Sequence, residues 1–176
     1  MCLVASLIIY FSKPSYYASF SSFITSTLLL VIFPLLAYPI YYIVPPFKKK
    51  GRVFQRKLAI IFAFISYIVV FALSFIFKDS WSIRVFYFAY VFSSICIFAS
   101  TKLLHFNASG HAAGMTGPII YLSFYVSPWY LLGLILVVLV YLASLYMKRH
   151  TLLELIWGSL LPSICIIVCF IIQSII

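Results

Sequence analysis

Residues 58–77 read LAIIFAFISYIVVFALSFIF, a run that contains no charged side chain. A helix rises about 1.5 Å per residue, so a helix over this run is about 30 Å long, which matches the hydrocarbon core of a bilayer. Inside a bilayer each backbone polar group must find its partner within the chain, and a helix provides those partners within one segment. The run therefore predicts a membrane-spanning helix.

The composition of the whole chain agrees with this prediction. Of the 176 residues, 66% are hydrophobic and 8% are charged, whereas about 25% of the residues of a soluble domain are charged. The two acids are Asp79 and Glu154, against 12 lysines and arginines, and the net charge is +10. These values exclude a soluble globular domain, a disordered chain, a coiled coil and a disulfide-rich secreted scaffold.

Apolar segments separated by short polar stretches predict six spanning helices packed in one bundle. Pro34 and Pro39 remove backbone donors and should bend the first span. Residues 1–12 are apolar but too few to span, and we expect a short interfacial or half-inserted helix there. The predicted spans are residues 20–45, 58–77, 82–104, about 112–127, 128–147 and 152–176.

The chain is thus expected to be an all-α, multi-pass membrane protein with a single transmembrane domain, residues 1–176, in a prokaryotic cell membrane. In a soluble protein a charge of +10 would suggest nucleic acid. Here the cations stand in short loops, where they orient the protein and meet lipid phosphates. The predicted partners are therefore membrane lipids and not nucleic acid, and the oligomeric state is left open, a homo-oligomer included.

Three polar clusters interrupt the spans, near residues 48–57, 105–114 and 144–154. Two spans separate each cluster from the next, so all three are expected on one membrane face. The chain between His111 and His150 has about the length of a helical hairpin, because each leg needs about 20 residues. The two histidines should therefore return to the same depth.

This face gathers side chains that can carry chemistry. His150 and Glu154 stand one helical turn apart, so the carboxylate can accept a hydrogen bond from one ring nitrogen and leave the other free to attack. This is the logic of a catalytic triad with histidine as the nucleophile. His111 is then the candidate general acid, which would protonate the leaving alcohol oxygen. The four cysteines have no zinc-binding spacing, and we expect no metal and no cofactor.

The same face carries groups that can bind a phosphoryl group. Lys49 and Arg56 supply positive charge, and backbone N–H groups around Ser109 and Gly110 can hold phosphoryl oxygens. A Lys/Arg run beside a spanning helix is also a usual topology signal. Both interpretations of Lys49 and Arg56 therefore stay open.

Several of these residues have simpler interpretations. Thr151 and Glu154 have the spacing of a capping box, in which Glu154 closes the first turn of the last helix, and the roles of cap and orienter can coexist. We interpret His105 as a polar anchor at the membrane interface. Asp79, next to Lys78 in a short turn, is interpreted as an ordinary loop acid.

The residues of this face resemble the motifs of the type 2 phosphatidic acid phosphatase family of membrane lipid phosphatases. The first motif of that family is Lys, six residues, Arg-Pro. Lys49 and Arg56 have this spacing, with Lys57 in place of the proline. The second motif, Pro-Ser-Gly-His, appears as the stretch Ala108-Ser109-Gly110-His111.

The third family motif is Ser-Arg, five residues, His, three residues, Asp. His150 matches its histidine, and Glu154 stands at the position of the acid. Ala143-Ser144 occupies the place of Ser-Arg, so a phosphate ligand of the family is missing. Arg149 or Lys148 could supply that charge from a different turn.

The resemblance spans roughly residues 20–170 and is greatest to compact members whose third motif reads His-Thr and whose acid is Glu or Gln. Gly158 also matches a glycine that is common in the final helix of such proteins. The resemblance implies that His150 forms a phosphohistidine, that His111 is the acid, and that the substrate is a lipid phosphate or diphosphate.

Two functional hypotheses follow. The first is a metal-independent hydrolase that cleaves a phosphomonoester or diphosphate of a prenyl or diacylglycerol lipid. The alternative is a catalytically silent family member that binds or senses lipid phosphates, because the arginine of the third motif is missing. A plain structural membrane subunit is a third, less favoured hypothesis.

The membrane side of the site is left open, with a slight preference for the cytoplasm. The family usually works at the extracytoplasmic face, whereas the positive-inside rule places the face richer in cations in the cytoplasm. The poorer face carries Lys13, Lys78 and Arg84. The richer, motif-bearing face carries Lys48, Lys49, Lys50, Arg52, Arg56, Lys57, Lys102, Lys148 and Arg149.

Overall fold

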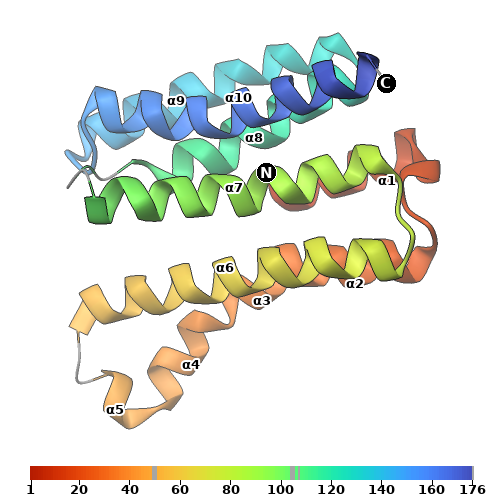
Figure 1. Ribbon diagram of the computed structural model, residues 1–176. Helices are drawn as coiled ribbons and strands as arrows, with labels where there is room; N and C mark the ends of the chain where they lie inside the picture. Colours follow the sequence, from red (N-terminus) through yellow and green to blue (C-terminus); the bar gives the residue numbers. More distant parts are fainter. Residues whose placement is uncertain (49–50, 104–105, 107, 176) are drawn as a thin grey trace.

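The computed structural model describes residues 1–48, 51–103, 106 and 108–175, and the regular elements in these ranges are all helical (Figure 1). The all-α prediction is thereby confirmed. The helices are α1 (Cys2–Ser12), η1 (Pro14–Tyr16), α2 (Phe20–Thr27), η2 (Leu28–Ile32), α3 (Phe33–Leu35), α4 (Ala37–Ile43), α5 (Pro45–Lys48), α6 (Gly51–Ile76), α7 (Trp81–Leu103), α8 (Gly110–Tyr125), η3 (Pro128–Gly133), α9 (Leu134–Tyr146) and α10 (Leu152–Ile175).

Within the described residues, five helical runs are long and apolar enough to cross a membrane, which is compatible with an integral membrane protein. The remaining predicted span, about 112–127, corresponds to α8. This helix has 16 residues, so it is about 24 Å long at 1.5 Å per residue, and six spans stay a prediction. The five runs are Phe20–Ile43, Lys57–Ile76, Trp81–Ser100, Pro128–Tyr146 and Leu152–Ile175.

The short helix α8 lies inside the bundle and packs against α7, α9 and α10 (Figure 1). Its first half is rich in small residues, among them the buried Ala112, Ala113 and Gly117. A Cβ added to Gly117 would lie 3.1 Å from the Cβ of Pro162 in α10. Small residues let helices approach closely where lipid tails are as apolar as the helix surfaces. They therefore explain why α8 and α10 pack so tightly.

The N-terminal helix α1 also belongs to the bundle. It packs against α8 and buries Ala5 and Ile9. Its 11 residues give about 16 Å of helix, which is too short to span a bilayer.

The first span is interrupted in the region of its two prolines. A π-helical stretch, η2, joins α2 to α3, which contains Pro34 and ends at Leu35. After Leu36 the chain continues as α4, which contains Pro39 and turns away from the line of α2 and α3 in Figure 1. The bend matches the loss of backbone donors at the prolines.

Asp79 is more than a loop acid, so that interpretation was wrong. It lies in the turn between α6 and α7 and is only 3% exposed. Its Oδ1 accepts the backbone N–H of Ala18 at 2.9 Å and the hydroxyl of Ser22 at 2.6 Å. A buried carboxylate needs such donors. Asp79 therefore joins the α6–α7 turn to the beginning of α2.

Candidate functional site

The helix ends next to the three polar clusters all lie at one end of the bundle. In Figure 1, α6 begins, α7 ends and α8 begins at this end, where α9 also ends and α10 begins. The helix directions therefore agree with the common face predicted for the clusters.

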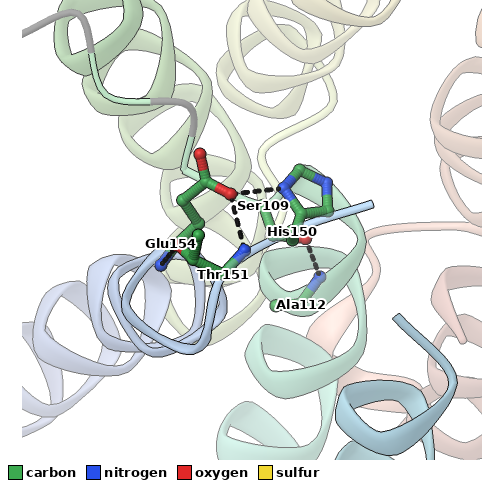
Figure 2. Close-up of polar contacts among 5 residues, drawn as sticks. All are labelled: Ser109, Ala112, His150, Thr151 and Glu154. Atoms are coloured by element: carbon green, nitrogen blue, oxygen red, sulfur yellow. Dashed lines mark hydrogen bonds and ion pairs between the residues drawn. The ribbon is translucent and has the colours of Figure 1, made fainter. Parts of the chain in front are cut away.

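His150 and Glu154 contact each other at the beginning of α10 (Figure 2). His150 Nδ1 lies 3.2 Å from Glu154 Oε2, and the two side chains are 10% and 16% exposed. The same Oε2 accepts the backbone N–H of Thr151 at 2.9 Å, and the Thr151 hydroxyl accepts the Glu154 N–H at 3.3 Å. Glu154 thus closes a reciprocal capping box and contacts His150 at the same time.

This contact has a chemical consequence for the imidazole ring. When Nδ1–H donates to the carboxylate, the lone pair of the neutral ring is on Nε2. Nε2 of His150 is then the nitrogen that can attack an electrophile, and Glu154 keeps the ring oriented.

Ser109 connects the Ser-Gly-His segment to the same pair. Its backbone N–H donates to the carbonyl oxygen of Glu154 at 2.9 Å. Its hydroxyl accepts the Ala112 N–H at 3.4 Å and so caps α8 (Figure 2). Because the Ser109 N–H is engaged inside the protein, the amides left for a phosphoryl oxygen are those of Gly110 and His111. Amides in the first turn of a helix have no helical partner.

Gly158 makes the approach of Ser109 to α10 possible. A Cβ at position 158 would overlap the Ser109 carbonyl oxygen and would lie 3.1 Å from the Ser109 nitrogen. The sequence does not predict this contact. The available signal was a glycine inside a helix, where it is unfavourable unless close packing requires it.

Gly110 and His111 begin α8 and are both exposed. They are therefore accessible from outside the bundle, unlike Ser109, which is fully buried. An anion that binds here would meet the positive end of the α8 dipole.

Lys148 lies in the turn that ends helix α9 and leads to α10. Lys148 has a φ of 51° and donates its N–H to Leu145 O at 3.0 Å, while Arg149 N–H donates to Ser144 O at 3.0 Å. These two bonds form a Schellman motif. The turn leaves Arg149 exposed next to His150.

The side chains of the cationic motif cannot be placed relative to this contact network. Lys49, His105 and the side chain of Arg56 lie outside the described residues. Arg56 belongs to α6, which packs against α7 and against the elements from α2 to α5. Among the described residues, α6 has no packing contact with α8 or α10. The structure thus brings His150, Glu154 and Ser109 together and places α6 on the other side of α7.

No protein-family model, no curated protein and no solved structure matches this chain.

Proposed function

We propose that this chain is a membrane-embedded, metal-independent lipid phosphatase that forms a phosphohistidine at His150. One observation carries the proposal: Glu154 contacts both motif segments, His150 through Oε2 and Ser109 through its carbonyl oxygen. A histidine oriented by an acid, beside the N-terminus of a helix, suits phosphoryl transfer to nitrogen.

In the first step, His150 Nε2 attacks the phosphorus atom. A P–N bond forms, the P–O bond to the lipid breaks, and the leaving oxygen takes a proton from the His111 imidazolium. Arg149 and the amides of Gly110 and His111 offset the charge on the phosphoryl oxygens. Lys49 and Arg56 are the further candidates for this role.

In the second step, water attacks phosphorus while His111 accepts one of its protons. The P–N bond breaks, and His150 returns to its neutral form. The products are inorganic phosphate and either a lipid alcohol, from a monoester, or a lipid monophosphate, from a diphosphate.

We further propose that the chain is inserted in a prokaryotic cell membrane as a multi-pass protein, with α8 as the inner helix of the bundle. The exposed apolar side chains of α9, such as Val138 and Leu142 at 56% and 59%, then face lipid. The phosphate-bearing substrate would be a membrane lipid, because the beginnings of α8 and α10 lie at the end of apolar helices, close to the region that lipid head groups occupy.

Phosphate release by purified protein in detergent tests this function. The substrates are a prenyl diphosphate, a prenyl phosphate and phosphatidic acid. We expect His150→Ala and His111→Ala to abolish or strongly reduce release, and His105→Ala, as a control on the third histidine, to leave it unchanged. Acid-labile, base-stable labelling with ³²P should appear in the wild type and vanish in His150→Ala. Release that survives His150→Ala would exclude the mechanism.

The alternative function is that of a silent protein that binds or senses lipid phosphates, and Ser144 favours it. This residue stands where the family has arginine, and it is a buried, uncharged residue of α9. Under this alternative the wild type binds vesicles containing phosphatidic acid but turns over none of the three substrates, and His150→Ala still binds.

A further inference from the structure

A chain of three hydroxyl groups lies deeper in the bundle than Glu154. Thr116 Oγ1 in α8 lies 2.9 Å from Ser159 Oγ in α10. Ser159 Oγ lies 2.6 Å from Tyr141 Oη in α9, and Tyr141 Oη lies 2.9 Å from the carbonyl oxygen of Leu155 in α10. The chain therefore links three helices.

The chemistry of the groups sets the direction of these hydrogen bonds. A carbonyl oxygen can only accept, so the Tyr141 proton points to Leu155 O. The 2.6 Å contact then requires that Ser159 donates to Tyr141, and Thr116 in turn donates to Ser159. Each of the three protons is used once, which leaves no hydroxyl hydrogen unpaired in an apolar setting.

The chain ends on the helical turn that carries the candidate acid. Leu155 directly follows Glu154, and its carbonyl accepts from Tyr141, on the α9 side. The neighbouring carbonyl, that of Glu154, accepts from the Ser109 N–H, at the beginning of α8. Two consecutive peptide oxygens in the first turns of α10 are thus held by two other segments of the protein.

Tyr141 makes the side-chain hydrogen bonds that connect α9 to α10. Both helices lie fully within the described residues, and the side-chain hydrogen bonds between them are the two made by Tyr141. The apolar packing of α9 is sparse, since its buried residues are Val137 and Ser144. The hydroxyl of Tyr141 therefore contributes a large part of the contact between α9 and the start of α10.

We infer that Tyr141 is a positioning residue for the His150–Glu154 pair. It holds the Leu155 carbonyl and thereby fixes the turn from which the Glu154 side chain reaches His150. The inference rests on the proposed function for its effect on turnover, but its structural half, the geometry of His150, can be measured without turnover.

The test compares Tyr141→Phe with Tyr146→Phe in the purified full-length protein. Tyr146 lies on the same helix and is 90% exposed, so its variant loses a hydroxyl without a buried partner. With a prenyl phosphate, we expect Tyr141→Phe to lower kcat about tenfold, the equivalent of one hydrogen bond, with KM changed less than about twofold. Tyr146→Phe should match the wild type.

A double-mutant cycle separates positioning from general loosening of the bundle. If Tyr141 acts through Glu154, Tyr141→Phe should have less than about a twofold further effect in a Glu154→Gln background. Ser159→Ala leaves the bond from Tyr141 to the Leu155 carbonyl in place and should therefore lower kcat less than Tyr141→Phe does. Fully multiplicative effects of Tyr141→Phe and Glu154→Gln, or an unchanged kcat, would overturn the inference.

Nitrogen-15 NMR of the histidines gives the readout that does not depend on turnover. In the wild type, His150 should show the Nδ1–H tautomer, and Tyr141→Phe should reduce its population while Tyr146→Phe does not. If the wild type is active and Tyr141→Phe changes neither the His150 spectrum nor kcat, the inference is overturned and the proposed function is not. An inactive wild type in which Tyr141→Phe still alters the His150 tautomer would overturn the proposed function and leave the positioning role standing.

Discussion

Gly158 of α10 and Ser109 at the beginning of α8 are in backbone contact, with no room for a side chain between them. A Cβ at 158 would overlap the Ser109 carbonyl oxygen. Gly158→Ala should therefore separate the two segments, lower the thermal stability of the purified protein and reduce phosphate release. Gly114→Ala is the matched control in α8, because a Cβ there meets nothing within 4 Å. A Gly158→Ala protein as stable and active as Gly114→Ala would contradict this prediction.

The two functions of Glu154 can be separated by substitution. Thr151→Ala removes the hydroxyl that accepts the Glu154 N–H and should lower the free energy of unfolding by about 1 kcal/mol, with turnover retained. Glu154→Gln keeps an acceptor for the Thr151 N–H but removes the charge beside His150, and should lower kcat on the order of 10- to 100-fold. Thermal unfolding and phosphate release on both variants check the separation, and equal losses of kcat would argue against it.

The role of His111 predicts a dependence on the leaving group. An alkoxide needs a proton to leave, whereas the phosphate oxygen displaced from a diphosphate is already a good leaving group. His111→Ala should therefore reduce kcat/KM, which reports only the steps up to cleavage of the P–O bond, at least about tenfold more on a prenyl phosphate than on the matching prenyl diphosphate. His150→Ala should reduce both equally, because both reactions need the nucleophile. Equal sensitivity of the two substrates to His111→Ala would remove the general acid from the mechanism.

Lys148 holds a left-handed backbone conformation, with φ at 51°, that a residue with a Cβ adopts at a cost of about 1 kcal/mol or more. Lys148→Gly should relieve this strain and raise the melting temperature by about 2–4 °C for a chain of this size. Lys148→Ala removes the same charge but keeps the strain, so it is the control. If the two variants have the same melting temperature, the backbone strain at Lys148 does not measurably lower the stability of the protein.

The hydrogen bonds that Asp79 accepts from Ala18 and Ser22 predict the order of stability of three proteins. Asp79→Asn keeps an oxygen that can accept from Ala18 and Ser22, whereas Asp79→Ala leaves two donors without a partner, at about 1–3 kcal/mol. The wild type should be the most stable, then Asp79→Asn, then Asp79→Ala. Ser22→Ala should cost little further in the Asp79→Ala background, since the shared bond is already lost. Thermal unfolding of the wild type and these three variants in detergent measures the order.

The features that the sequence predicts are those encoded within a few neighbouring positions. The five long helical runs follow from uninterrupted apolar stretches, and the double contact of Glu154 follows from its spacing to His150 and Thr151. The bounds of α8 are less predictable than its length. Ser109 caps the helix, which therefore begins at Gly110 and ends at Tyr125, about two residues before the span that hydropathy predicts.

Contacts between distant positions could not be predicted in this way. Asp79 meets Ser22 across 57 positions, and its neighbour Lys78 gave a sufficient local explanation for an acid in a turn. The bond from Ser109 N–H to Glu154 O joins two motifs through the backbone, which is the same for every residue type and so leaves no trace in the side-chain pattern.

The shortness of α8 bears on where a phosphate would sit relative to the bilayer surface. At about 24 Å, the helix is shorter than a hydrocarbon layer of about 30 Å, so an α8 that crosses the bilayer as predicted would have at least one end below the level of the lipid head groups. Non-helical backbone is tolerated at that depth when protein covers it, and the buried, fully bonded Ser109 meets this condition. If the end at Ser109 is the deeper one, a lipid phosphate that reached the exposed His111 would lie below the head groups of its neighbours in the leaflet, and the depth of the site would favour a substrate that is anchored in the membrane over a soluble phosphate ester.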